Sequence, residues 1–425
     1  MADSGRELTA DKDIHPLLRD AFDTLDATGA RWLLLRGADD VTNPTGDVDL
    51  LADPIANQEL DSALSDVGFF RTAAPGHGSH RFYFGYDAIG GTWVKLDIVS
   101  SVTFGAFAEW QTGLADGCLQ RRIRVDGLPR PTAEDEAWLL LLHLVLDKGG
   151  IASSRVSAAA AAAGLATEVG PIPGELDARA GSGSAGQLLA CVRSGRFKDV
   201  PELADDLHRR AAKPLMRRGI ELRTRVLRRL AGPTLAGRRI QGLKVAVMGP
   251  DGAGKTTLLH GIGDHFPVQA AYVYMGMWAA GPWDTGIHRV PGGRSAQKIY
   301  RIAKGGTVAA YHTARGRLVL LDRVAYDAML PGSIDYTLGG RLTAALMLRF
   351  APTLDLLFVL DAPAEVMFAR KGEHTLEVLD RWRCGYLEIA TRVPQSVVLD
   401  AARPAAEVRR DAVDTVWQLL TRGRR

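Results

Sequence analysis

The residues from Gly249 to Thr256 have the types and spacing of a loop that binds phosphate groups. Their pattern is G-x-x-x-x-G-K-T, and it follows an apolar stretch that is typical of a strand. Because glycine tolerates positive φ, Gly249, Gly252 and Gly254 let the backbone turn its N–H groups toward an anion. Lys255 is expected to be a solvent-facing charge for the β- and γ-phosphates, and the Thr256 hydroxyl a ligand for Mg²⁺. The pattern predicts a site for ATP and Mg²⁺.

A second group of residues that could take part in catalysis is a set of carboxylates near the N-terminus. Asp47 and Asp49 alternate with apolar residues, so on a strand both side chains lie on one face. The two carboxylates repel each other, so the pair favours binding of a cation. Asp97, in the β-rich run 92–99, is well placed to add a third oxygen ligand. Three acids suit a two-metal site. The alternative is a surface strand whose acids are only solvated.

A third group is an acid followed by an arginine, Asp322 and Arg323, directly after the apolar residues Leu318-Val-Leu-Leu. An acid at the carboxyl end of a buried strand faces the ligand crevice of a doubly wound sheet. We therefore expect Asp322 to reach Mg²⁺ or its waters. Arg323 is expected to pair with a phosphate through its planar guanidinium.

Two sets of elements must position these groups. Apolar runs predict strands at 32–35, 47–51 and 92–99 in the first part of the chain, and at 243–248, 271–274, 317–322 and 356–360 in the last part. In the last part strands alternate with helical patterns, which indicates a parallel sheet. The fold class is therefore α/β, with an N-terminal α/β domain that has a helical extension and a C-terminal parallel α/β sandwich.

The length of 425 residues exceeds what a single core usually supports. We expect domains at 1–130 and 241–425, joined by a helical connector at 131–240. The Gly-, Pro- and Ser-rich stretch 170–186 is interpreted as flexible, and the basic residues within 201–240 as a solvated interdomain helix. His143, alone on an apolar helix, is expected to be a core residue without chemistry.

Composition limits the class of protein. The net charge of +3 is too small to indicate nucleic-acid binding. The three cysteines lack the spacing of metal ligands, and they fit free thiols in a reducing cytoplasm. No apolar run reaches the roughly 20 residues that span a bilayer. The expected partner is a small molecule in the cytoplasm, and a homodimer is left open.

The N-terminal part resembles the nucleotidyltransferase superfamily typified by DNA polymerase beta. The match is Leu35-Arg-Gly-Ala38, eight residues, then Asp47-Val-Asp-Leu50. The resemblance implies that Asp47, Asp49 and Asp97 hold Mg²⁺ for attack on the α-phosphate of a nucleoside triphosphate, with Gly37 beside the phosphates. Ala38 departs from the usual Gly or Ser, which implies a slow, altered or lost activity.

The region 241–423 resembles the thymidylate kinase family of P-loop nucleoside-monophosphate kinases. The resemblance rests on the phosphate loop, on Asp322-Arg323, on the run from Asp355 to Arg370, and on Arg381-Trp-Arg-Cys-Gly-Tyr386. It implies that Asp322 supports the metal and Arg323 holds the acceptor phosphate. The residues implied to bind ATP and its acceptor are Gly249, Asp251, Gly252, Ala253, Gly254, Lys255, Thr256 and Thr257, with Asp251 near the acceptor sugar.

Two departures from the family concern the catalytic charge and the acceptor. Ala253 occupies a position that is Arg in some members, so the charge in the transition state is expected from Arg370, Lys371 or Arg381. The family's Arg-Glu-Pro-Gly segment is replaced by an aromatic, Met-containing run that starts at Tyr272. Thymidine monophosphate is therefore only one candidate acceptor.

These observations favour an ATP-dependent phosphotransferase of thymidylate kinase type, with a nucleoside monophosphate or related small acceptor, fused to a nucleotidyltransferase-like domain. One alternative is a nucleotidyltransferase whose P-loop domain is a nucleotide-dependent regulatory module. Another is a switch in which ATP binding moves domains without transfer.

Overall fold

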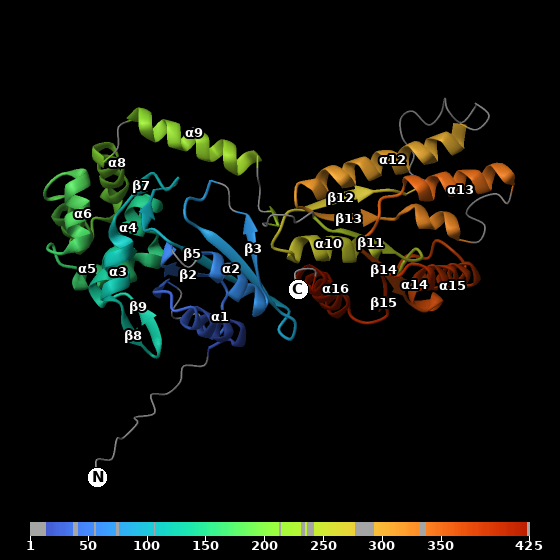
Figure 1. Ribbon diagram of the computed structural model, residues 1–425, viewed down its shortest axis with the longest axis horizontal. Helices are drawn as coiled ribbons and strands as arrows, with labels where there is room; N and C mark the ends of the chain where they lie inside the picture. The colour runs from blue at the N-terminus through green and yellow to red at the C-terminus, as the bar shows by residue number, and fades with distance from the viewer. Residues whose placement is uncertain are drawn as a thin grey trace, which may run out of the picture. The chain divides into compact units, whose positions relative to one another are not determined.

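The structure is a computed structural model of the whole chain, and it describes residues 14–36, 41–54, 57–73, 76–105, 107–211, 214–230, 234–235, 242–276, 293–330 and 337–422. The chain divides into two compact units, one formed by residues 1–87 and 92–232 and the other by 233–425 with 88–91 (Figure 1). Both units combine strands and helices, which confirms the predicted α/β class. Among the described residues, no helix combines the length and apolar character needed to cross a membrane.

The N-terminal unit contains a mixed sheet in which five strands follow the order β1-β2-β5-β4-β3. β2 and β5 are parallel, and the other neighbouring pairs are antiparallel. The strands of this sheet are β1 (Trp32–Arg36), β2 (Asp47–Ala52), β3 (Phe69–Ala73), β4 (Arg81–Asp87) and β5 (Thr92–Val99).

The two faces of this sheet bury different helices, because successive side chains of a strand point in opposite directions. Leu34 and Leu50 lie in a core with α1 (Pro16–Ala27) and α2 (Asn57–Asp66). Leu33 and Leu51 point the other way into a core with the helical half. That half contains α3 (Leu114–Arg121), α4 (Ala133–Leu142), η2 (His143–Asp147), α5 (Val156–Leu165), α6 (Pro171–Ala180), α7 (Ser184–Arg193) and α8 (Val200–Ala211).

The helical region is thus continuous with the N-terminal core. The expectation that 170–186 is flexible was wrong, because these residues form α6 and the start of α7. Pro171 stands at the first position of α6, where its missing N–H is not needed, and Ile172 and Leu176 are buried. Gly170 and Gly181 cap the two ends of α6, and Gly183 caps the start of α7. α9 (Pro214–Leu230) follows this half.

Shorter elements complete the N-terminal unit and the junction to the next. They are β6 (Thr103–Phe104), β7 (Trp110–Gln111), β8 (Ile123–Val125), β9 (Leu128–Arg130), η3 (Ser153–Arg155), η4 (Phe197–Asp199) and β10 (Thr234–Leu235). β6 pairs with β7 and β8 with β9, each as a two-stranded antiparallel sheet.

The C-terminal unit is built on a five-stranded sheet, in the order β12-β13-β11-β14-β15, and every neighbouring pair is parallel. This confirms the predicted parallel sheet and is consistent with a P-loop-like fold. The strands are β11 (Lys244–Met248), β12 (Ala270–Tyr274), β13 (Leu318–Asp322), β14 (Leu356–Asp361) and β15 (Ser396–Asp400).

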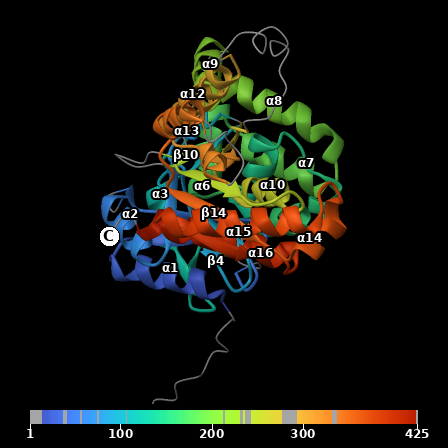
Figure 2. The ribbon, with the colours of Figure 1, turned by 90° about the vertical axis from the view of Figure 1, so that its right-hand side faces the viewer.

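Helices cover both faces of this sheet, as the continuous apolar character of its strands requires. α10 and α16 pack against each other on one face, while α12 and α15 contribute to the core on the other. Figure 2 turns this unit toward the viewer and shows the orange helices α12 and α13 as neighbours. The helices are α10 (Lys255–His265), α12 (Gly293–Ala314), η5 (Ala325–Met329), α13 (Leu338–Phe350), α14 (Ala364–Lys371), α15 (Leu376–Arg392) and α16 (Ala405–Arg422).

The strand order places a topological switch at β11, because the chain next adds β12 and β13 on one side and later β14 and β15 on the other. Ligands of doubly wound sheets bind at such a switch, outside the carboxyl ends of the strands. The loop after β11 and the acid at the end of β13 both lie at this edge.

Candidate functional site

The predicted phosphate loop connects β11 to α10 at the switch point. Gly249, Gly252 and Gly254 have φ angles of 152°, 87° and 94°, which confirms the positive φ expected at all three. A Cβ atom on Gly252 would lie 2.5 Å from the carbonyl oxygen of Met367, so this close approach requires glycine. α10 begins at Lys255, directly after the loop, and its N-terminus favours an anion there.

Lys255 lies beneath the loop and is only 8% exposed, so the expectation that it faces solvent was wrong. Its Nζ donates hydrogen bonds to the carbonyl oxygens of Gly249 (2.9 Å) and Pro250 (2.8 Å), and it lies 3.3 Å from Asp251 Oδ1. Burial and the nearby positive charge of Arg323 lower the pKa of Lys255, against the opposing effect of Asp251. The ammonium group is held at the centre of the loop that it is predicted to serve.

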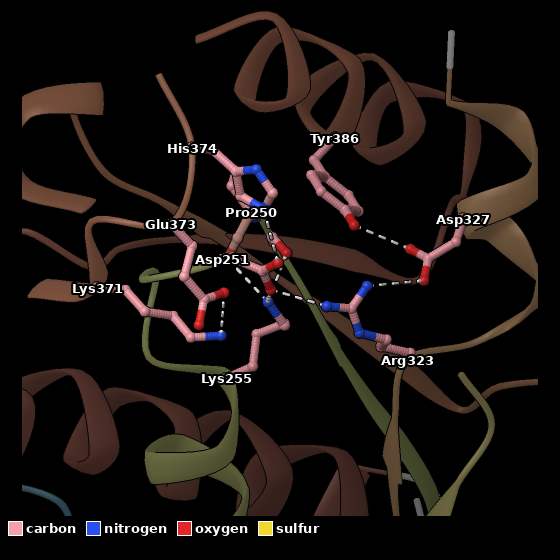
Figure 3. Close-up of polar contacts among 10 residues, drawn as sticks. Pro250, Asp251, Lys255, Arg323, Asp327, Lys371, Glu373, His374 and Tyr386 are labelled. Atoms are coloured by element: carbon pink, nitrogen blue, oxygen red, sulfur yellow. Dashed lines mark hydrogen bonds and ion pairs between the residues drawn. The ribbon is translucent and has the colours of Figure 1, made fainter. Parts of the chain in front are cut away.

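Arg323 follows β13 in a backbone conformation that is uncommon for residues other than glycine, with a φ of 61°. Its Nη2 donates a hydrogen bond of 2.8 Å to Asp251 Oδ1, and its Nη1 lies 3.7 Å from Asp327 Oδ2 (Figure 3). Unusual backbone conformations of this kind gather at ligand sites, where surrounding contacts maintain them. The two carboxylates balance the positive charge of Arg323.

Asp327 is buried, and the sequence interpretation missed it although it lies four residues after Arg323. Tyr386 Oη donates a hydrogen bond of 3.0 Å to Asp327 Oδ1. Burial raises the pKa of Asp327, with Arg323 and the Tyr386 hydrogen bond acting in the opposite direction. Burial and the neighbouring carboxylate also raise the pKa of Tyr386.

Asp251 connects this group to two further residues that the sequence interpretation missed, Glu373 and His374. His374 Nε2 lies 3.5 Å from Asp251 Oδ2. Within the described part of the chain, Asp251, Glu373 and His374 form the group whose carboxylate and imidazole atoms are spaced for a metal ion, all within 4.8 Å of one another. Although burial opposes it, the charges of Lys255 and Arg323 lower the pKa of Asp251, so its carboxylate is ionised.

Two predicted magnesium ligands lie at the same edge of the sheet. Asp322 is the last residue of β13, and in the strand register it pairs with Val247 of β11. Its Oδ1 is buried and has no hydrogen-bond partner, while Thr256 is exposed at the first turn of α10. A buried carboxylate oxygen without a partner and a nearby hydroxyl are the oxygen donors that Mg²⁺ prefers, so these residues fit the ion.

A cavity of about 240 Å³ lies on the other side of the loop, between α10 and the segment after β15. Ala253, Gly254 and Thr257 line it together with Arg370 and Arg403. Arg370 Nη1 donates a hydrogen bond of 3.0 Å to the carbonyl oxygen of Ala401 at this cavity. The structure thus brings Asp251, Lys255 and Arg323 together and places Ala253, Thr257 and Arg370 at the neighbouring cavity.

The other residues named for the catalytic charge or the acceptor lie at the periphery. Arg381 is exposed on α15, and Lys371 Nζ lies 2.9 Å from Glu373 Oε2. Tyr272 of β12 packs against the ring of His260 at a centroid distance of 4.8 Å, which is packing between strand and helix. Tyr274, at the end of β12, pairs in register with Asp322.

The N-terminal carboxylates lie on neighbouring strands. Asp49 of β2 and Asp97 of β5 are partners in the parallel register, and Asp47 lies at the start of β2. Each carboxylate has a basic partner at hydrogen-bonding distance: Asp47 Oδ2 lies 2.5 Å from Lys95 Nζ, Asp49 Oδ2 2.8 Å from Arg36 Nε, and Asp97 Oδ2 2.8 Å from His80 Nδ1. Carboxylate oxygens suit Mg²⁺. With these basic partners in place, the three acids do not form a group spaced for a metal ion in the described part of the chain.

Asp49 shows the electrostatic cost of this arrangement. Burial raises its pKa, Asp97 and Asp47 raise it further, and Arg36 and His143 oppose the shift. A carboxylate with a raised pKa beside two other acids favours the approach of a cation. Gly37 and Ala38, which carry the other half of the nucleotidyltransferase-like pattern, lie outside the described residues.

A cavity of about 1340 Å³ opens beside Asp47 and Asp49 within the N-terminal unit, and His143 lines it. The side chain of His143 is 21% exposed and its Nδ1 lies 2.6 Å from Asp147 Oδ2, so the residue is partly buried and has a partner. It stands at the start of a π-helical turn beside the cavity. That His143 has no chemical role stays a prediction.

Comparisons with known proteins do not assign a family: no protein-family model matches the chain, and no curated protein matches it. A functional conclusion therefore depends on the geometry of the two sites.

Proposed function

We propose that the C-terminal unit is an ATP-dependent phosphotransferase of thymidylate kinase type, which acts on a nucleoside monophosphate or a related small acceptor. The observation that carries the proposal is the position of Lys255. Its ammonium group lies at the centre of a glycine-rich loop that follows β11, the middle strand of a parallel sheet. A loop of this kind binds the phosphates of nucleoside triphosphates.

In this proposal the triphosphate replaces the interactions that Lys255 makes with its own loop. Lys255 exchanges the carbonyl oxygens of Gly249 and Pro250 for phosphate oxygens, which bind an ammonium group more strongly. The base of ATP occupies the 240 Å³ cavity lined by Thr257 and Arg370, next to the loop. Transfer is in line, and the protein contributes mainly by positioning the reactants.

Thr256 and Asp322 would hold Mg²⁺ in this site, and the ion would supply positive charge to the phosphate oxygens when bound. The acceptor lies on the side of Asp251 and Arg323, where a guanidinium and a carboxylate are already paired and can each turn to a ligand. Arg381 or Lys371 supplies further charge during transfer.

The test is an acceptor screen with ATP and Mg²⁺ that follows ADP formation. The screen contains nucleoside monophosphates, sugars and polyols, and Lys255→Met is the matched variant because it keeps the apolar stem that packs beneath the loop. We expect ADP formation that depends on one acceptor class and falls at least about 100-fold in Lys255→Met, the loss typical of one removed charge-stabilising donor. ADP formation that is equal in the two proteins would refute the proposal.

A second candidate function, nucleotidyl transfer by the N-terminal unit, is favoured by one observation. Asp49 and Asp97 are register partners on the parallel strands β2 and β5, and Asp49 opens onto a large cavity. Asp47, Asp49 and Asp97 would hold Mg²⁺ after displacement of their basic partners, and the ion would supply charge at the α-phosphate when bound. Release of pyrophosphate that is lost in Asp49→Asn tests this function separately from ADP formation.

A further inference from the structure

A histidine and an aspartate in the N-terminal unit form a pair that neither function uses. His143 Nδ1 lies 2.6 Å from Asp147 Oδ2, and the other oxygen of Asp147, Oδ1, accepts a hydrogen bond of 2.6 Å from the backbone N–H of Gly105. Both oxygens of Asp147 are therefore engaged, which fixes the carboxylate and, through it, the imidazole ring.

The backbone around this pair has an uncommon form. α4 ends at Leu142, and the chain continues from His143 to Asp147 as a single π-helical turn. Turns of this type are rare, and they occur frequently at functional sites because they change the direction of side chains on a helix. His143 and Asp147 are the first and last residues of this turn, and both line the cavity.

The partner of Nδ1 determines what the other ring nitrogen can do. An ionised carboxylate only accepts hydrogen bonds, so Asp147 favours the tautomer with the proton on Nδ1. Nε2 then carries a lone pair, and it has no hydrogen-bond partner among the described residues. His143 lines the same cavity as Asp47 and Asp49, and its electrostatic interaction with Asp49 opposes the rise in the pKa of that carboxyl.

The cavity has two kinds of wall. The end that contains Asp47, Asp49 and Arg36 is charged, whereas the helical half contributes an apolar set, namely Leu139, Leu140, Leu144, Ile151 and Phe197, with Glu136, Lys148 and Arg155 also in the lining. Pockets for a single small ligand usually have volumes of about 300–1,000 Å³. A volume of about 1340 Å³ therefore leaves space for a triphosphate at the charged end and a second molecule against the apolar wall.

We propose that His143 is the general base of a nucleotidyl-transfer site in this cavity, that Asp147 is its positioning residue, and that the acceptor is a small hydroxyl compound with an apolar portion. The proposal rests on the second candidate function. His143 Nε2 takes the proton of the acceptor hydroxyl while the acceptor oxygen forms a bond to the α-phosphorus. The bond from the α-phosphorus to the oxygen that bridges to the β-phosphate breaks, pyrophosphate leaves, and His143 returns the proton to water.

The test measures pyrophosphate released from ATP and from GTP with Mg²⁺ by the full chain, with water, glycerol, glucose and 2-phenylethanol as acceptors. We expect the highest rate with 2-phenylethanol, the probe that combines a hydroxyl with an apolar group. His143→Ala should reduce the rate about 100-fold or more, in the usual range for loss of a general base. Thermal unfolding of the variant should be nearly unchanged, which separates loss of the base from loss of the fold.

Chemical rescue distinguishes a base from a structural histidine. Added imidazole should restore part of the rate in His143→Ala, because it can occupy the space left by the side chain and accept the proton. It should restore nothing in Asp49→Asn, the matched inactive variant with an intact His143. Asp147→Asn should lower kcat with little change in KM for the triphosphate, since Asn can leave the proton on the wrong ring nitrogen.

The role of His143 and nucleotidyl transfer itself can fail separately. Pyrophosphate release that needs Asp49 but persists in His143→Ala would overturn the role of His143 and leave nucleotidyl transfer standing. A full chain that binds triphosphate and releases no pyrophosphate with any of the four acceptors would overturn both.

Discussion

Arg323 Nη2 and Asp251 Oδ1 are joined by a hydrogen bond of 2.8 Å, which links the end of β13 to the phosphate loop after β11. The same Asp251 carboxylate lies beside Lys255, so one acid restrains both positive side chains of the site. Because these cations lower its pKa against the effect of burial, Asp251 is ionised wherever the protein is folded near neutral pH. The loop is therefore organised by charge before any phosphate binds.

Asp251→Asn should reduce the free energy of unfolding of the C-terminal unit by about 1.5–3 kcal/mol at pH 7, the range for a hydrogen bond between charged groups. The folded pKa of Asp251 lies below its ordinary value of 3.8, so the stabilisation by its carboxylate is complete above pH 3.8 and is lost as the pH falls through the folded pKa. Guanidinium denaturation of both proteins across this range measures the difference. A difference that does not shrink on acidification would show that the ionised carboxylate is not its source.

Tyr386→Phe removes the hydroxyl that donates to the buried Asp327 while keeping the ring in place. The buried Asp327 carboxyl, whose pKa is already raised by burial, then loses one hydrogen-bond donor. We therefore expect the free energy of unfolding to fall by about 1–3 kcal/mol. Tyr300→Phe, on an exposed part of α12, is the matched control and should change stability by less than about 0.5 kcal/mol. Equal effects of the two variants would mean that the hydroxyl of Tyr386 contributes little.

Asp49→Asn should stabilise the N-terminal unit at pH 7. Burial and the neighbouring acids raise the pKa of Asp49, so its ionised form is disfavoured in the folded state relative to the unfolded state. The favourable contribution of the protonated carboxyl is complete below the ordinary pKa of 3.8 and is lost as the pH rises through the folded pKa. Thermal unfolding should therefore show a higher Tm for Asp49→Asn at pH 7 and a smaller gain near pH 3.5.

The control for this effect is Asp23→Asn on the exposed side of α1, which removes one negative charge at a site without burial. A gain of the same size in Asp23→Asn would assign the stabilisation to net charge. A loss of stability in Asp49→Asn would mean that its ion pair with Arg36 outweighs the cost of burial.

The sequence predicted the elements that carry the chemistry because their local signals are strong. The glycines of the phosphate loop need positive φ, and the short apolar runs before Gly249 and Asp322 are typical of buried strands. The side chains between elements were not predictable in this way. Tyr386 and Asp327 are 59 residues apart, and only the packing of α15 against the sheet brings them together.

Two misjudged features have local causes. Lys255 was expected to face solvent because it stands at a helix start, but its long stem lets the ammonium group reach back to the loop carbonyls. The residues 170–186 were expected to be flexible, although Gly170, Gly181 and Gly183 cap the ends of two helices.

The two sites should work independently of each other. Asp47→Asn combined with Asp49→Asn should abolish pyrophosphate release and leave ADP formation within about twofold of the original rate. The acids lie in the unit that ends at residue 232, and Lys255, Asp322 and Arg323 belong to the other, so each site has its own strands and its own predicted metal ligands. Sites without shared partners usually respond independently to substitution.

The measurement is a pair of assays on the same preparation, one for ADP and one for pyrophosphate, with Lys255→Met as the reciprocal variant. Lys255→Met should abolish ADP formation and spare pyrophosphate release, which controls for general damage in either variant. Loss of both products in the double variant, with thermal unfolding intact, would contradict independence. The carboxylates Asp47 and Asp49 would then take part in phosphoryl transfer itself, and one composite reaction would replace two separate ones.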